Sequence, residues 1–116
     1  MKVGIVGYRK FIDYDLFETT VKKWEEENGT IDVIVSGGAP GTDTMAKFYA
    51  EKHNKTFIVF PAEWKKYGRG AGPIRNKLII ENSDRLIAFL SPKSKGTQDS
   101  IKKAKKLNLK INVINI

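Results

Sequence analysis

The segment 31–50 constrains the fold more strongly than any other part of the chain. An apolar, β-branched run at 31–35 is followed by the small residues of 36–43, Ser-Gly-Gly-Ala-Pro-Gly-Thr-Asp. A run that ends in small residues is typical of a buried parallel strand stopping at a tight turn. Beyond the turn, apolar residues return at helical spacing, namely Met45, Ala46, Tyr49 and Ala50. The segment therefore predicts a strand, a glycine-rich turn and a helix.

The glycine-rich turn has two interpretations. Glycines let a backbone approach a ligand closely, and free N–H groups at the start of a helix favour an anion. Thr42 and Asp43 can cap this helix, but the Asp43 carboxylate would repel a phosphate placed beside it. Alternatively, the turn only connects a strand to a helix, since glycine-rich turns are common at such points.

Length and composition exclude several classes of protein. The 116 residues fit one domain with a hydrophobic core. There is no cysteine, which excludes disulfides and thiolate chemistry, and the single histidine, His53, excludes a multi-histidine metal site. No apolar run approaches the length of a membrane span, and residues 1–2 lead directly into a predicted strand instead of a signal peptide. We therefore expect a cytoplasmic protein without a membrane partner.

Positive charge is concentrated in the second half of the chain. The formal net charge is +8; residues 1–58 hold 8 Lys and Arg against 9 Asp and Glu, whereas residues 59–116 hold 13 against 4. A basic half suggests a polyanionic partner, from a nucleotide to a nucleic acid. Five of its lysines belong to 102–110, however, around one predicted helix, where a solvated helix face is the simpler explanation.

The rest of the chain alternates between strand and helix patterns. Further apolar runs predict strands at 2–6, 56–60, 85–90 and 111–114. Asp13 is a candidate N-cap for a helix that ends at Asn-Gly, 28–29, with Trp24 in the core. The second helix runs to about residue 54, which leaves His53 exposed and without a catalytic role. A last helix is predicted at 98–107, with Leu107 facing inward.

The segment 61–73 has no periodicity and is long for a loop in a small domain, which indicates a functional loop. Pro73 can open the next helix in its first turn, with Ile74 and Leu78 on the inner face and Ile79 as a further candidate there. Arg75 then lies in the first turn, where a cation opposes the helix dipole. We interpret Arg75 as an anion ligand or a clamp on the loop, with a plain surface arginine as the alternative.

Five strands alternating with four helices predict a single Rossmann-like, three-layer α/β domain over residues 1–116, with a five-stranded parallel sheet. Right-handed crossovers place every strand-to-helix turn at the carboxyl edge of such a sheet, where ligands bind. The turns at Gly7, Gly37 and Gly96 and the loop at Trp64 then meet at one edge, which favours phosphate binding. The three-glycine dinucleotide fingerprint and the P-loop lysine motif are both absent, so an ordinary dehydrogenase or NTPase is excluded.

Several of these segments, taken together, resemble one known superfamily. They are 7–11 (Gly-Tyr-Arg-Lys-Phe), 36–43, 61–64 (Pro-Ala-Glu-Trp), 70–76 (Gly-Ala-Gly-Pro-Ile-Arg-Asn) and 95–97 (Lys-Gly-Thr). In combination they are similar to the SLOG superfamily, the Rossmann-like group that contains the DNA-processing protein DprA and the LOG phosphoribohydrolases. The chain most resembles its small, stand-alone YspA-like branch, which is found in bacteria and their phages, and the resemblance covers nearly the whole chain.

The resemblance implies a protein that senses or sequesters a nucleotide or a nucleotide-derived ligand, such as an ADP-ribose-like, cyclic or mononucleotide. Carried over by motif, the implied ligand-binding residues are Gly7, Tyr8, Arg9, Ser36, Gly37, Gly38, Gly41, Asp43, Trp64, Arg75, Asn76, Gly96 and Thr97. Gly96 and Thr97 would bind the phosphate, and Trp64, or Tyr67 near it, would either stack on a base or pack the loop. No cofactor is required, although Mg²⁺ could accompany the phosphate, and a homodimer is compatible with the resemblance.

The resemblance also leaves an enzymatic alternative, a hydrolase of N-glycosidic bonds in nucleotides. LOG enzymes carry a late motif, Pro-Gly-Gly-x-Gly-Thr-x-x-Glu, with a catalytic glutamate. The matching run 92–100 lacks two of the glycines and has Ser100 at the glutamate position. A serine supplies neither the acid or base nor the charge that glycosidic cleavage needs, and Asp99 lies one residue early, about 100° around the helix. A hydrolase therefore requires Asp43 or Glu63 as a substitute.

A second alternative is a DprA-like binder of single-stranded DNA. It would use the basic second half of the chain, in particular Lys102, Lys103 and Lys106. Such binding weakens steeply with salt, and neutralising these lysines would lower affinity for all sequences alike.

Overall fold

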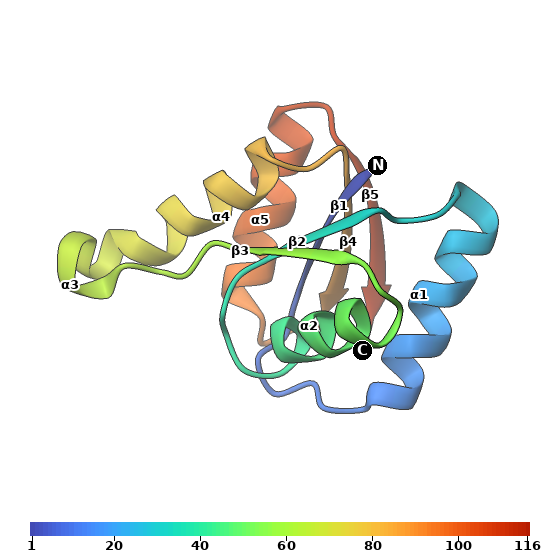
Figure 1. Ribbon diagram of the computed structural model, residues 1–116. Coiled ribbons are helices and arrows are strands. Elements are labelled where there is room, and N and C mark those ends of the chain that lie inside the picture. The colour runs from blue at the N-terminus through green and yellow to red at the C-terminus, as the bar shows by residue number, and fades with distance from the viewer.

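The computed structural model describes residues 1–116 and contains one five-stranded sheet between two layers of helices (Figure 1). All neighbouring strands are parallel, in the order β3-β2-β1-β4-β5. The strands are β1 (Lys2–Gly7), β2 (Val33–Ser36), β3 (Thr56–Val59), β4 (Arg85–Leu90) and β5 (Lys110–Asn115). The predicted α/β class and the parallel five-stranded sheet are confirmed.

The helices follow the strands in the expected alternation, and none is long and apolar enough to cross a membrane. They are α1 (Tyr14–Asn28), α2 (Thr42–Lys52), α3 (Trp64–Tyr67), α4 (Ala71–Glu81) and α5 (Lys95–Lys106), with a 3₁₀ turn, η1 (Gly68–Gly70), after α3. The start of α1 agrees with the prediction, because the Asp13 carboxylate accepts a hydrogen bond from the Leu16 N–H at 3.1 Å. The helix ends at Gly29, whose φ of 104° favours glycine.

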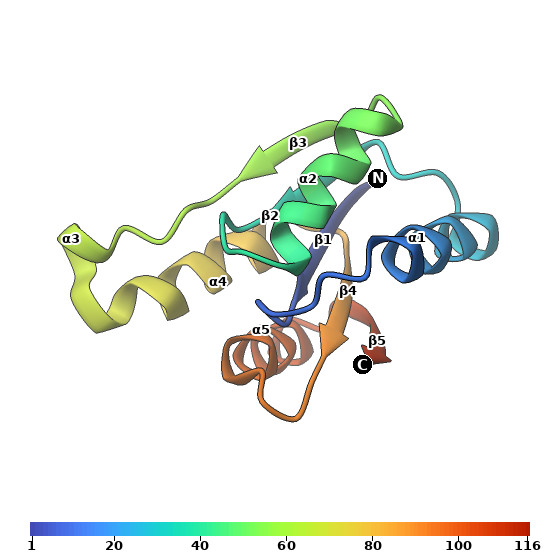
Figure 2. The ribbon, with the colours of Figure 1, turned by 90° about the horizontal axis from the view of Figure 1, so that it is seen from below.

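Each face of the sheet has its own core. One face is covered by α1 and α2 (Figure 2). These helices bury an aromatic cluster that includes Phe17, Tyr49 and Phe89, and Trp24 is buried there as predicted. On the other face, α4 and α5 pack against the sheet through smaller aliphatic residues. These are Val6, Val35, Ile79, Ile80, Leu86, Ala88, Ile101 and Ala104.

The segment 61–73, predicted as an irregular loop, is largely helical. It contains α3 and η1, and α4 starts at Ala71. Pro73 therefore lies in the first turn of α4 as predicted, whereas Arg75, the fifth residue, lies beyond the first turn in which the sequence analysis placed it. A proline fits the first turn of a helix because the N–H groups there have no intrahelical acceptor. Two short turns are too brief to produce a periodic pattern, which explains why the sequence did not reveal them.

The prediction for the inner face of α4 is wrong for Ile74 and Leu78 and confirmed for Ile79. Ile74 and Leu78 are 38% and 39% exposed, whereas Ile79 and Ile80 are buried. Figures 1 and 2 both show the reason: α3 and the first half of α4 extend beyond the sheet, so only the second half of α4 has a face to cover.

The last helix also differs from the prediction, since α5 starts at Lys95 rather than at residue 98. The preceding turn closes early because the Ser91 N–H donates to Ser94 Oγ and the Ser94 N–H donates to the Ser91 carbonyl, both at 2.9 Å. Gly96 therefore lies in the first helical turn. Leu107 follows the helix and is 57% exposed, in contrast to its predicted inward orientation.

The strand order reverses at β1. β2 and β3 lie on one side of β1, whereas β4 and β5 lie on the other. In open parallel sheets a crevice forms at such a reversal, beyond the carboxyl ends of the two central strands. The topology therefore places a candidate ligand site after β1 and β4.

Candidate functional site

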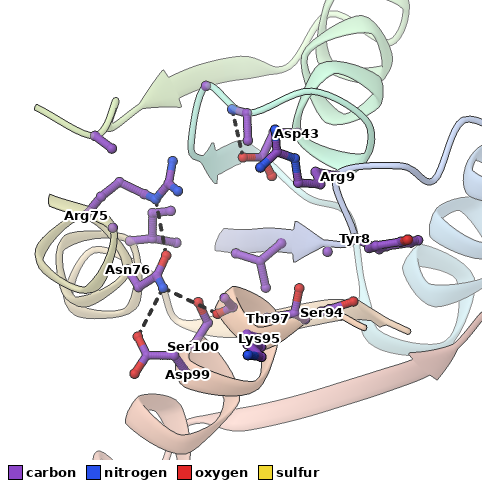
Figure 3. A pocket seen from close by; sticks show the side chains of 18 of the residues that line it. Tyr8, Arg9, Asp43, Arg75, Asn76, Ser94, Lys95, Thr97, Asp99 and Ser100 are labelled. Atoms are coloured by element: carbon purple, nitrogen blue, oxygen red, sulfur yellow. Dashed lines mark hydrogen bonds between the residues drawn. The ribbon is translucent and has the colours of Figure 1, made fainter. Parts of the chain in front are cut away.

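A cleft of about 990 Å³ opens at this position. Its walls come from the turns after β1, β2 and β4, from residues that follow β3, and from α4 and α5 (Figure 3). Ten of the thirteen residues that the sequence implicates line it, and they are Gly7, Tyr8, Arg9, Gly38, Asp43, Trp64, Arg75, Asn76, Gly96 and Thr97. Segments far apart in the sequence thus converge on one cavity.

The other three residues, Ser36, Gly37 and Gly41, lie behind the cleft wall and not on its surface. Ser36 is fully buried, and its hydroxyl donates to the Ile5 carbonyl at 2.6 Å, which ties β2 to β1. Gly41 has a φ of 75°, and a Cβ there would collide with the Arg9 backbone. These residues shape the site without facing a ligand.

Position 37 has room only for a glycine, because the Arg75 guanidinium occupies the space that a side chain would need. A Cβ at Gly37 would collide with Arg75 Nη1 and would lie 2.7 Å from Asp43 Oδ2. The guanidinium and the Asp43 carboxylate therefore meet at this glycine, on the wall of the cleft. The only hydrogen bond of the Arg75 side chain within the protein is from Nε to Asn76 Oδ1, at 3.1 Å, so both Nη groups are left for a ligand.

Asp43 is a buried carboxyl, 8% exposed, in the first turn of α2. Burial raises its pKa above the usual range, although the Ala39 N–H, the Ser36 hydroxyl and the Arg75 charge all act in the opposite direction. The Ala39 N–H donates to Oδ2 at 3.2 Å, which fixes the glycine-rich turn. Asp43 thus has a structural role and also faces the cleft.

The N-terminus of α5 opens into the cleft without a side-chain cap. Ser94 occupies the N-cap position, but its hydroxyl accepts from the Ser91 N–H instead of from the first turn of the helix. The backbone N–H groups of Lys95, Gly96 and Thr97 have no acceptor within the protein. Free N–H groups at a helix N-terminus, together with the helix dipole, form an anion-binding site.

The cleft also contains lysines that the sequence analysis did not select. Lys93 and Lys95 line it beside Arg9 and Arg75, and none of the four forms an ion pair within the protein. The remaining carboxylate, Asp99, also lines the cleft, but it accepts hydrogen bonds from Lys103 and Asn76. These bonds outweigh the effect of burial and lower the pKa of Asp99. The cleft thus has an excess of unpaired positive charge.

The two acids proposed as catalytic substitutes differ in position. Asp43 lines the cleft, whereas Glu63 is exposed at the start of α3 and lies outside it. Ser100, at the LOG glutamate position, lines the cleft but is 1% exposed. Trp64 lines the cleft and is 60% exposed, while Tyr67 is exposed and does not reach it. No group of three or more His, Asp or Glu side chains is placed to hold a metal ion.

The fold and this cleft define a doubly wound α/β protein with a crevice lined by unpaired cations at its switch point. Residues 1–67, more than half of the chain, match the YspA, cpYpsA-related SLOG family (YAcAr). The chain therefore belongs to this family, in agreement with the resemblance found in its motifs. No curated protein sequence matches the chain significantly.

A solved structure of DNA processing protein A from Helicobacter pylori has the same fold. It is 24% identical and superposes with a TM-score of 0.73 over 97% of this chain. This chain spans 64% of the length of that protein. That structure concerns the binding of single-stranded DNA by DNA processing protein A.

Proposed function

We propose that the cleft binds a nucleotide or a nucleotide-derived ligand through its phosphate, and that the protein senses or sequesters this ligand. The observation that carries the proposal is the open first turn of α5, whose free N–H groups face the crevice. The unpaired cations Arg75, Lys93 and Lys95 surround the same space and would balance the charge of the phosphate.

Gly96 supports the proposal because the fold itself does not require a glycine there. A Cβ at Gly96 would meet no heavy atom within 4 Å, and its φ is not in the left-handed region. A glycine in a helix costs about 0.5–1 kcal/mol relative to alanine. Close approach of a ligand to the backbone accounts for this cost.

Trp64 is placed to contact the rest of such a ligand. Its indole lines the outer end of the cleft and is 60% exposed, although Gly72 lies near one edge of the ring. Stacking of a base on an aromatic ring contributes about 1–3 kcal/mol in single-stranded nucleic-acid complexes. A nucleotide would therefore span the cleft, with its phosphate at α5 and its base near α3.

Mass spectrometry of small molecules released on denaturation, followed by calorimetry with AMP, ADP, ADP-ribose and cyclic nucleotides, tests the proposal. We expect binding by the wild type and its loss in Gly96→Val, which fills the space above the first turn of α5. This variant should keep its thermal stability, because its new side chain meets open space. Arg75→Ala should also weaken binding. Its matched control is Arg69→Ala, because Arg69 lies on η1 and outside the cleft. Unchanged binding by Gly96→Val would overturn the proposal.

Single-stranded DNA is the second candidate ligand, and a groove beside the cleft favours it. This groove, of about 420 Å³, has a floor of Leu90 and Ile101 and is bordered by Lys95, Lys102 and Lys105. It shares Lys95 with the cleft, so phosphates of a longer ligand could continue from one hollow into the other. The fold shared with DNA processing protein A, a single-stranded DNA binder, also supports this candidate.

The lysines that carry this candidate differ from those selected from the sequence. Lys103 is engaged by Asp99, and Lys106 lies outside the groove, whereas Lys102 is common to both sets. We expect Lys102→Glu combined with Lys105→Glu to abolish salt-sensitive binding of oligothymidylate and to leave ADP binding unchanged. The control is Lys103→Glu combined with Lys106→Glu, which has the same change of charge. Equal losses in the two double variants would reject the groove as the binding surface.

A further inference from the structure

Asn76 is the one residue of the cleft that connects both of its anion-binding elements. Its amide is nearly buried, at 7% exposure, between α4 and α5. Oδ1 accepts a hydrogen bond from Arg75 Nε at 3.1 Å. Nδ2 donates to the Gly96 carbonyl at 3.3 Å and to Asp99 Oδ2 at 3.0 Å (Figure 3).

These three bonds use both ends of the amide and fix its orientation. The oxygen must face Arg75, because only the NH₂ group can donate to the two acceptors on α5. A ligand could bond to Nδ2 only by displacing one of those acceptors. Asn76 is therefore better explained by its protein partners than by the direct ligand contact that the sequence suggests.

We propose that Asn76 is a positioning residue: it holds the Arg75 guanidinium against Gly37 and ties it to the first turn of α5. The Nε bond removes one rotational freedom of a long side chain and directs the Nη groups into the cleft. The bond to the Gly96 carbonyl connects the same amide to the open N–H groups of α5. A phosphate bound at α5 and the Arg75 guanidinium are thereby coupled. The importance of this coupling for ligand binding rests on the function proposed above.

The structure offers a matched control on the same helix. Asn82 ends α4, and its Nδ2 donates to the Leu78 carbonyl at 2.8 Å, so it bonds only within its own helix. Asn82→Ala removes an asparagine side chain from α4 without contact to Arg75 or α5. Asn76→Leu keeps the branched shape and the number of side-chain heavy atoms, although its methyl groups are larger, and it removes all three hydrogen bonds of the bridge.

Nitrogen-15 NMR of the arginine side chains tests the first link without any ligand. The chain has four arginines, so Arg75 can be assigned through the Arg75→Lys variant. We expect a protected Arg75 Nε–H signal in the wild type and in Asn82→Ala, and its broadening or loss in Asn76→Leu. An unchanged signal in Asn76→Leu would overturn the inference.

A second variant keeps the test informative if Asn76→Leu does not fold. Asn76→Asp retains an oxygen for Arg75 Nε but replaces the donor to α5 with a carboxylate beside Asp99. The Arg75 Nε–H signal should then persist, while the backbone N–H signals of residues 95–97 shift. If those signals do not move, the proposed connection to α5 is wrong.

Calorimetry with ADP separates positioning from a general structural effect. We expect Asn76→Leu to weaken ADP binding about tenfold, the effect of losing one charge-assisted hydrogen bond. In an Arg75→Ala background the same substitution should have an effect of less than about twofold, since Asn76 acts through Arg75. Additive losses would overturn the inference. If wild-type protein binds no nucleotide, the proposed function fails, and the NMR result alone still decides the role of Asn76.

Discussion

The two faces of the sheet differ in how their charged side chains are paired. Beneath α1 and α2, carboxylates meet cations within the protein: Glu18 lies 2.8 Å from Lys52 and 3.0 Å from His53, and Glu25 lies 2.8 Å from Lys55. Around the cleft, on the side of α4 and α5, none of the four lining cations forms an ion pair, although the Arg75 guanidinium lies near the Asp43 carboxylate. On the α1–α2 face, ion pairs connect neighbouring elements, whereas on the other face the cations of the cleft remain free to contact a ligand.

The cations of the cleft are only part of the uneven charge of the chain. The second half holds 13 Lys and Arg against 4 Asp and Glu, and of these cations Arg75, Lys93 and Lys95 line the cleft. Lys102 and Lys105 line the neighbouring groove. Like charges placed close together repel, so an anion bound in the cleft would relieve the repulsion among its cations.

Breaking the charge network on the α1–α2 face should have the largest effect on stability. Lys55 is almost buried, and its Nζ donates to Glu25 at 2.8 Å and to the Ile31 carbonyl at 2.7 Å. Lys55→Ala leaves a carboxylate without its cation and should lower the free energy of unfolding by about 3 kcal/mol. Urea denaturation measures this loss, and ADP affinity should not change.

The control for that variant is Lys22→Ala, which removes an exposed lysine whose Nζ lies 4.0 Å from Glu18. It should change the free energy of unfolding by less than about 0.5 kcal/mol. Similar losses in both variants would contradict the view that burial gives the Lys55 network its strength.

On the cleft side, Gly37→Ala should affect binding far more than stability. The new Cβ displaces the end of the flexible Arg75 side chain, so ADP affinity should fall about tenfold, corresponding to one lost charge-assisted hydrogen bond. Gly41→Ala provides the contrast, because its Cβ collides with backbone at a φ of 75° and should cost about 1–3 kcal/mol of stability. Calorimetry and thermal denaturation of both variants separate the two effects; a large loss of stability in Gly37→Ala would contradict this assignment.

Removing the one unpaired acid of the cleft should strengthen anion binding. Asp43→Asn keeps an oxygen that accepts from the Ala39 N–H but removes a negative charge, so ADP affinity should rise severalfold. Since burial raises the pKa of Asp43, the variant should be at least as stable as the wild type at neutral pH. Chromatography of released base tests the hydrolase alternative in the same samples: turnover by the wild type that Asp43→Asn abolishes would establish it.

The sequence predicts the fold well because strand periodicity and glycine turns are local signals. The strands and the N-cap of α1 could be predicted from such signals, and their parallel order follows from crossovers that have one preferred hand. The sequence does not reveal the two helical turns of 64–70 because each is only about one turn long, too short for a hydrophobic residue to recur at helical spacing. Ile74 was assigned to a buried face because a pattern shows which side of a helix is apolar but not where the sheet ends.

The sequence predicts which turns form the candidate site, but it does not predict which side chains contact one another there. Glycine positions indicate where a backbone approaches something, whereas the structure shows that Gly37 approaches Arg75 and that Gly96 faces open space. Lys93 and Lys95 lie in or beside the late Gly-Thr segment, but the sequence assigns them no contact, and their role follows only from their place in the cleft. Likewise, His53 was expected to be exposed, but it is partly buried against Glu18, 35 residues away, a pairing that no local pattern reveals.

The smallest predicted effect is a pH dependence of the free energy of unfolding, caused by Glu18 and its contacts with Lys52 and His53. Hydrogen bonds from Lys52 and the contact with His53 lower the pKa of Glu18 to about 2 in the folded protein, from 4.5. Because the folded pKa is the lower one, the stabilisation is complete above about pH 5 and is lost as the pH falls toward 2. The stability difference between wild type and Glu18→Gln should therefore shrink as the pH falls from about 5 toward 2. Urea denaturation at each pH measures it, with Glu26→Gln, an exposed residue without a partner, as the control. A difference that stays constant down to pH 2.5 would show that the carboxylate charge contributes nothing to the contact between α1 and α2.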